Sequence, residues 1–299
     1  MVKLNSPTSS PRVVRVRMTD GVELATERWG DPAAPCLLFA HGFGQTRHAW
    51  SGACRALAAN GWQCLSFDAR GHGESDRMPA GNYHLQQFIN DLQALAYAES
   101  EPPVLIGASM GGLLGIALAG TSPSPPLSAL VLVDITPRWE ASGVERILAF
   151  MRAYPEGFVD IDEVTTAIGK YLPHRREHKN EERLRALLRS SDDGRLHWHW
   201  DPELLDAVAG EGERYQPMLL EATRNIRLPT LLISGGRSDV VSDRTVDEFL
   251  QLLPQAQHVR IPKATHMVAG DANDAFTTEI ENFVRALPQA VRTNEVNTT

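Results

Sequence analysis

The segment Gly107-Ala108-Ser109-Met110-Gly111 could carry a reactive serine. It follows the apolar run PVLIG and precedes the helical sequence LLGIALAG. A sharp turn from a strand into a helix exposes such a serine, and small residues two positions before and after it permit the strained turn. The helix that follows favours developing negative charge at its N-terminus. We therefore predict that Ser109 is a nucleophile, which needs a neighbouring base to accept its proton.

The elements that must position Ser109 alternate along the chain. Two segments with alternating polarity, 13–18 and 22–29, predict a half-exposed hairpin. Short apolar runs are typical of strands covered on both faces, and they occur at 36–40, 63–67, 103–107, 128–134 and 230–235. Helical periodicity occurs between them, at 47–59, 84–98, 109–119, 241–252 and 271–286. This alternation predicts an α/β fold with a mostly parallel central sheet flanked by helices.

With these elements in place, the chain resembles the α/β-hydrolases. His41-Gly42-Phe43-Gly44 follows the strand at 36–40, where that family has an HGxG oxyanion loop. The resemblance assigns the two oxyanion-hole N–H groups to Phe43 and Met110. Donors of this kind stabilise the oxygen of a tetrahedral intermediate. The segment DARGHGES at 68–75 resembles the family's DxRGxGxS loop, so the resemblance gives Asp68 and His72 a structural role and not a catalytic one.

In this fold the nucleophile comes first in the chain, then the acid, then the histidine. His266 lies in KATHM, after the short strand HVRIP, where the family places its base. Asp239 lies in GGRSD after the strand at 230–235, and we predict it as the acid. Asp134 is the alternative, because it ends the strand at 128–134 and some members place the acid there. An acid in either place would orient the imidazole and stabilise its charged form.

The α/β alternation stops between about 138 and 225, where charged helical sequence replaces the apolar runs. We therefore predict a core domain formed by 1–137 and 226–299 and a helical lid formed by 138–225. Aromatic residues of this insertion favour a small or medium apolar acyl or aryl substrate. Trp139, Trp198 and Met267 are the candidate pocket residues.

Composition excludes several function classes. The net charge of −8 argues against nucleic acid or an anionic membrane surface as the main partner. The N-terminal sequence lacks the apolar core of a secretory signal, and no apolar stretch approaches a membrane span in length. Cys36, Cys54 and Cys64 are odd in number and lack CxxC spacing, which predicts free thiols and a cytoplasmic location.

No cofactor or metal is expected. The chain has no GxGxxG or GxxxxGK[ST] motif for a nucleotide. Its histidines at 174, 178, 197 and 199 have no carboxylate or thiolate at ligand spacing, so packing within the lid is the simpler interpretation. Serine at the elbow disfavours the epoxide- and halide-cleaving members of the family, which carry aspartate there.

The predicted function is therefore serine hydrolysis of a carboxylic ester, lactone or related acyl bond through an acyl-enzyme, with perhydrolysis as a possible side reaction. Two alternatives stay open: a carbon–carbon hydrolase of a vinylogous diketone, and a ligand-binding receptor with little turnover.

Overall fold

An eight-stranded sheet organises the computed structural model, which describes residues 10–172, 181–209 and 212–288. The strand order is β1-β2-β4-β3-β5-β6-β9-β10. β1 and β2 pair antiparallel, as do β2 and β4, and every other pairing in the sheet is parallel. The strands are β1 (Arg12–Arg17), β2 (Glu23–Trp29), β3 (Cys36–Ala40), β4 (Gln63–Phe67), β5 (Val104–Ala108), β6 (Ala129–Val133), β9 (Thr230–Gly235) and β10 (Gln257–Ile261). The predicted fold class, with its mostly parallel sheet, is confirmed.

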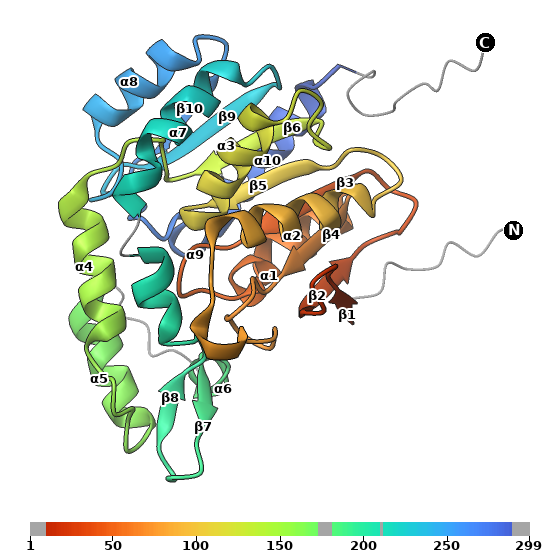
Figure 1. Cartoon of the computed structure of the whole chain (residues 1–299). Coiled ribbons are helices and arrows are strands. Elements are labelled where there is room, and N and C mark those ends of the chain that lie inside the picture. Colours follow the sequence, from red (N-terminus) through yellow and green to blue (C-terminus); the bar gives the residue numbers. More distant parts are fainter. Residues whose placement is uncertain (1–9, 173–180, 210–211, 289–299) are drawn as a thin grey trace, which may run out of the picture.

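Helices cover both faces of this sheet (Figure 1). One face packs against α1 (Ser51–Ala59) and α10 (Asn273–Ala286), whose buried side chains share a cluster with those of the strands. The other face packs against α2 (Leu85–Tyr97), α3 (Met110–Thr121), α7 (Gly212–Asn225) and α8 (Asp243–Leu252). Shorter elements are η1 (Arg47–Trp50), η2 (Pro79–Gly81) and α9 (Val268–Asp271). Nearly every residue of α3 is buried, as expected for a helix that is apolar all round.

The chain between β6 and β9 forms the remaining elements. These are α4 (Ala141–Arg152), α5 (Ile161–Tyr171), α6 (Glu181–Arg185), β7 (Leu188–Ser190), β8 (Leu196–Trp198) and η3 (Leu205–Ala209), followed by α7. In Figure 1 the green α4, α5 and the β7–β8 hairpin extend away from the central sheet. The antiparallel hairpin was not part of the predicted helical lid. Its strands are only three residues long and leave a weak sequence pattern.

α7 lies within the predicted insertion but packs against α3. A Cβ added to Gly120 of α3 would lie 2.0 Å from the carbonyl oxygen of Ala222 in α7, so the two backbones nearly touch. α7 thus lies in the helix layer over the sheet, while α4 to η3 lie beyond the strand ends (Figure 1). The division into a core at 1–137 and 226–299 and a lid at 138–225 stays a prediction.

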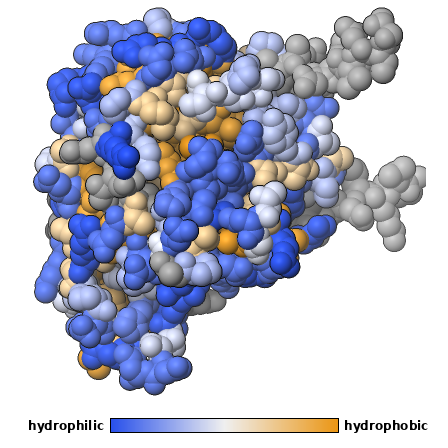
Figure 2. Space-filling model, in the orientation of Figure 1, coloured by the Kyte–Doolittle hydropathy of each residue, from blue (hydrophilic) through white to orange (hydrophobic). Residues whose placement is uncertain are grey.

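The surface is mainly polar on the face that Figure 2 shows, with apolar side chains in smaller patches among hydrophilic ones. This agrees with the net charge of −8. Among the described residues, no helix has both the length and the apolar character needed to cross a membrane.

Candidate active site

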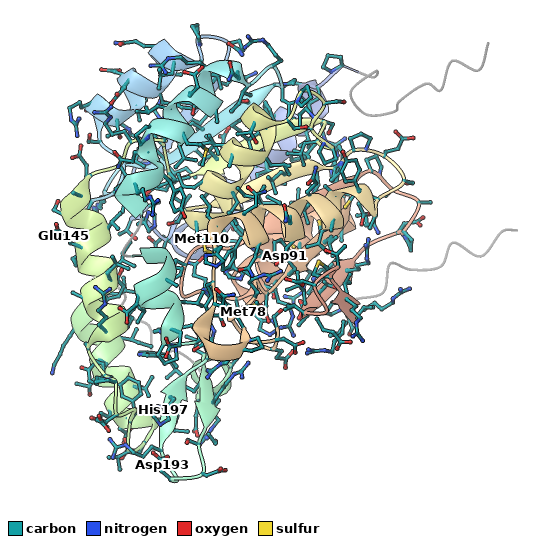
Figure 3. The ribbon with its side chains drawn as sticks, viewed as in Figure 1. Met78, Asp91, Met110, Glu145, Asp193 and His197 are labelled. Atoms are coloured by element: carbon teal, nitrogen blue, oxygen red, sulfur yellow. The ribbon has the colours of Figure 1, made fainter. Side chains whose placement is uncertain are left out.

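Ser109 lies in a strained turn at the junction of β5 and α3. Its backbone φ of +47° is in the left-handed region, which non-glycine residues rarely adopt. Close packing enforces the turn: a Cβ added to Gly107 would lie 2.5 Å from the carbonyl carbon of Gly111, and one added to Gly111 would lie 2.3 Å from the oxygen of Ala40. Only glycine fits at either position. Met110 follows at the start of α3, near the middle of the molecule in Figure 3.

The loop after β3 lies directly beside this serine. A Cβ added to Gly42 would lie 3.2 Å from the Cβ of Ser109. Met110 is the first residue of α3, so its N–H has no carbonyl one turn earlier in the helix to bond. Within the described residues, the N–H of Phe43 has no protein acceptor either. Neither predicted oxyanion donor therefore has a protein partner among the described residues.

Three buried histidines fix the loop after β3. The ring of His41 accepts from the Ala69 N–H at Nε2 (2.9 Å), so Nδ1 carries the proton and donates to the oxygen of Gly42 (2.8 Å). His72 Nε2 accepts from the Gly44 N–H (3.2 Å). His199 Nδ1 accepts from the Gly73 N–H (2.9 Å), which leaves Nε2 to donate to the Gly44 oxygen (3.2 Å). Each ring thus bonds the loop in one neutral tautomer.

Burial holds these rings neutral. It lowers the pKa of His41, and together with the neighbouring His41 and His199 rings it lowers the pKa of His72 well below its ordinary value. Burial also lowers the pKa of His199 to about 3, with a further contribution from His41. A neutral ring is needed at each site, because each accepts a backbone N–H.

The segment 68–75 also contacts the chain that follows β3. The buried carboxylate of Asp68 accepts from the backbone N–H of Arg47 (2.6 Å) and of Glu74 (2.9 Å), and it also pairs with the Arg47 guanidinium. Ser75 donates to the Asp68 carbonyl oxygen (2.6 Å). These contacts agree with a structural role for Asp68.

His266 pairs with Asp134. Its Nδ1 lies 2.7 Å from Oδ2 of Asp134, whose side chain has no exposed surface, while 13% of the His266 side chain is exposed. The same carboxylate accepts from the Gly235 N–H (2.7 Å) and from the Ser238 hydroxyl (2.5 Å). An imidazole held by a buried carboxylate at one nitrogen can accept a proton at the other.

The prediction that Asp239 is the partner of His266 is wrong. The carboxylate of Asp239 turns to α4, where Arg146 donates to it from Nε (2.7 Å) and from Nη2 (2.6 Å). α4 passes so close that a Cβ added to Gly143 would lie 2.2 Å from the Asp239 carbonyl oxygen. Asp239 is therefore a contact between the sheet edge and the insertion, and Asp134, the alternative acid, takes the place beside the imidazole.

The pairing of β6 with β9 explains why Asp134 and not Asp239 lies beside His266. β6 lies beside β9, and the Asp134 N–H bonds the Ile233 oxygen (2.8 Å), so the loops after both strands meet at one edge of the sheet. Asp134 has φ of +50°; it and Ser109 are the only non-glycine residues with positive φ in the described ranges. Such strain clusters at functional sites. The Ser109 N–H also bonds the Val133 oxygen (3.2 Å), which ties the two turns together.

The predicted pocket residues lie in different places. Trp139 and Trp198 are both buried, and Trp198 lines a cavity within the insertion. Met267 follows His266, and its sulfur accepts from the Gln45 amide at 3.0 Å. Gln45 also accepts the Gly42 N–H (3.1 Å), so it joins the loop of His266 to the loop of Phe43.

Sequence reasoning missed two supporting residues. Gln45 lies one position beyond the HGFG segment, and no pattern marks it. His199 has a signal in HWHW at 197–200, but packing within the lid is the simpler interpretation of that pattern. His197, two residues before it, lies on β8, in the lower part of Figure 3. His174 and His178 lie outside the described residues.

Comparison with known proteins identifies the family. Residues 35–272 match the family model of the α/β-hydrolase fold, which covers most of the chain, so the chain belongs to this family. It is 30% identical over 281 residues to 3-hydroxybutyrate-oligomer hydrolase of Cupriavidus necator, an alignment that covers 87% of this chain and 93% of that one. It is 29% identical to esterase Rv0045c of Mycobacterium tuberculosis, over 87% of this chain and 85% of that one.

Solved structures agree on the fold. The crystal structure of E-2-(acetamidomethylene)succinate hydrolase superposes with a TM-score of 0.78 at 24% identity, covering 92% of this chain and all of that one. The crystal structure of the M. tuberculosis esterase superposes with a TM-score of 0.70 at 27% identity, covering 94% of this chain and 93% of that one. Hydrolase and esterase names among these relatives support hydrolysis as the general activity.

Proposed function

We propose that this chain is a serine hydrolase that cleaves a carboxylic ester, a lactone or a related acyl bond, with Ser109 as nucleophile, His266 as base and Asp134 as acid. The observation that carries the proposal is the 2.7 Å hydrogen bond from His266 to the buried Asp134, at the same sheet edge as the strained turn of Ser109. A carboxylate–imidazole pair at the same sheet edge as a serine hydroxyl is the kind of arrangement that activates serine.

The reaction follows in two stages. His266 Nε2 accepts the Ser109 proton as the hydroxyl oxygen attacks the carbonyl carbon, and the resulting oxyanion accepts from the Phe43 and Met110 N–H groups. Collapse of this intermediate releases the alcohol, which takes the proton from His266 and leaves an acyl group on Ser109. Water then repeats the sequence with the same base and frees the acid. Asp134 stays ionised and fixes the proton on Nδ1 throughout.

The substrate we propose is a small molecule with an apolar acyl or aryl group, because the insertion carries buried aromatic side chains such as Trp139 and Trp198. A cytoplasmic location is part of the proposal; the three cysteines, Cys36, Cys54 and Cys64, are buried and unpaired.

Hydrolysis of p-nitrophenyl acetate and butyrate, with fluorophosphonate labelling, tests the proposal. The wild-type chain should turn over and be labelled, whereas Ser109→Ala should lose both while its urea unfolding transition is retained. Undiminished labelling of Ser109→Ala would reject Ser109 as the nucleophile. Specific ligand binding without turnover by the wild-type chain would favour a receptor instead.

A further inference from the structure

A cavity of about 530 Å³ lies between the insertion and Arg77, which belongs to the segment after β4, and Ser109 is not among its lining residues. This volume is within the range of small-molecule sites. Part of its wall is apolar: Trp198 and Trp200 stack with ring centroids 4.9 Å apart and planes inclined by 15°, and Met151 and Leu205 also line it.

Three arginines are among the residues that line this cavity: Arg77, Arg152 and Arg189. Among the lining residues that the structure describes, only Asp206 carries a carboxylate, and it lies 3.6 Å from Arg152. Arg77 and Arg189 form no ion pair among the described residues; each donates instead to a backbone oxygen, Arg77 to that of Trp200 (3.2 Å) and Arg189 to that of Gly73.

Arg77 and Arg189 carry like charges at one cavity, and neither has an ion pair within 4 Å among the described residues. Burial lowers the pKa of Arg189 and the positive charge of Arg77 lowers it further, while the carboxylates of Asp201, Asp68 and Glu74 act in the opposite direction. A guanidinium carries five N–H donors, so one bond to a carbonyl leaves most of them for a ligand. An anion at this point would offset the repulsion and accept those donors, and the planar fork of arginine suits the two oxygens of a carboxylate.

The cavity shares a wall with the loop of the proposed oxyanion hole. A Cβ added to Gly44 would lie 2.8 Å from the terminal methyl of Met151 and 3.7 Å from Cε3 of Trp200, and both of these side chains line the cavity. A ligand here would therefore be next to the catalytic loop.

We propose that this cavity binds the carboxylate of an apolar organic acid, with Arg77 and Arg189 holding the carboxylate and Trp198 and Trp200 covering the apolar part. The choice of a carboxylate rests on the proposed function, since ester hydrolysis produces carboxylic acids. The acid is either the distal end of a substrate or a separate molecule, such as a product, and both have the same recognition chemistry.

Equilibrium binding of sodium 4-phenylbutyrate tests the proposal without any need for turnover. Tryptophan fluorescence should report it, because Trp198 and Trp200 line the cavity, and calorimetry checks the stoichiometry. We expect saturable binding that weakens with added salt, and at least about tenfold weaker binding of the neutral isostere 4-phenylbutyramide, since hydrogen bonds to charged groups contribute more than neutral ones. No saturable binding up to about 10 mM, a concentration that would reveal even millimolar affinity, overturns the proposal.

Variants locate the site. Arg77→Gln, at an exposed side chain, and Arg189→Gln should each weaken binding about tenfold, and Arg189→Lys should recover part of the loss because it restores the charge. Arg195→Gln is the matched control: Arg195 is on the same hairpin and also donates to backbone oxygens, those of Glu156 and Gly157, but it does not line the cavity. Equal affinities in all four variants, or equal binding of acid and amide, overturn the assignment.

A kinetic comparison separates the two sources of the carboxylate. A lower KM for mono-p-nitrophenyl glutarate than for p-nitrophenyl valerate, lost in Arg77→Gln, identifies the distal end of a substrate. Binding of 4-phenylbutyrate with equal KM values for the two esters identifies a separate acid. Hydrolysis of the neutral ester tests the proposed function alone, so failure of that function and failure of the carboxylate site give different results.

Discussion

Asp134→Asn is the substitution that most directly tests the proposed machinery. The carboxylate has three hydrogen-bond partners: the Gly235 N–H, the Ser238 hydroxyl and His266 Nδ1. The asparagine oxygen must face the Gly235 N–H, which needs an acceptor, so the NH₂ group faces His266. Nδ1 then accepts, and the imidazole proton moves to Nε2, where the ring can no longer accept the proton of Ser109.

The same change of tautomer in a well-studied serine protease lowers kcat by about 10⁴. That factor corresponds to about 5 kcal/mol of transition-state stabilisation. We expect a loss of this size for Asp134→Asn, because the carboxylate has no exposed surface and water cannot take its place.

Asp239→Asn is the matched control, since it removes a carboxylate from the adjacent loop. Asp239 pairs with Arg146, and the two side chains are 35% and 50% exposed. Exposed ion pairs contribute about 0–1 kcal/mol, so we expect the rate to stay within about fivefold of wild type.

The assay is kcat/KM for p-nitrophenyl butyrate, with the rate of fluorophosphonate labelling as a second measure of the nucleophile. Urea unfolding of each variant checks the fold. A larger loss in Asp239→Asn than in Asp134→Asn would refute the assignment of the acid. Equal losses would show that the bond between His266 and Asp134 has no special part in activating Ser109.

Three further results are expected. His199 stays neutral in the folded protein, whereas in the unfolded chain it takes up a proton below about pH 6.5. The free energy of unfolding should therefore fall as the pH is lowered from there towards 3, by about 2 kcal/mol at pH 5 for this ring. Urea unfolding should show a smaller fall between pH 7 and pH 5 in His199→Gln than in wild type, and an equal fall contradicts this. Gly44 has φ of +73° and packs against Met151, so Gly44→Ala should lower kcat at least about tenfold. Gly61 has φ of +91° with open space around it, so the control Gly61→Ala should affect stability alone. Equal kcat values in the two variants would argue against a fixed loop at Gly44. Trp198→Ala should lower the free energy of unfolding by about 3–5 kcal/mol, because the side chain is buried against Trp200; a loss below 1 kcal/mol would mean that this packing is weak.

The fold could be predicted from local patterns because its strands are buried on both faces. The apolar runs at 36–40 and 103–107 became β3 and β5, and the turn between 107 and 111 needs glycine at both ends for reasons of close contact. The hairpin of β7 and β8 could not be predicted, because strands of three residues are too short for a period-two pattern to appear.

The residues of the candidate site could be predicted where they lie in the loop that follows a recognisable strand. Ser109 and the loop of Phe43 come directly after a strand, His266 lies five residues after β10, and the carboxyl ends of parallel strands meet at one edge. His199 was not predictable in this way, since its contact with Gly44 joins segments that are 155 residues apart.

The sequence by itself determined the α/β alternation, the strained serine turn and the set of two candidate carboxylates, because each of these depends on neighbours along the chain. It favoured Asp239 over Asp134 as the partner of His266, although both follow buried strands, and this prediction was wrong. Only the tertiary structure decided, by placing β6 beside β9 so that Gly235 and Ser238 orient the Asp134 carboxylate towards His266, while α4 brings Arg146 to Asp239. The direction of each carboxylate at this sheet edge depends on hydrogen-bond partners about 100 residues away in the chain. A local sequence pattern does not identify such partners.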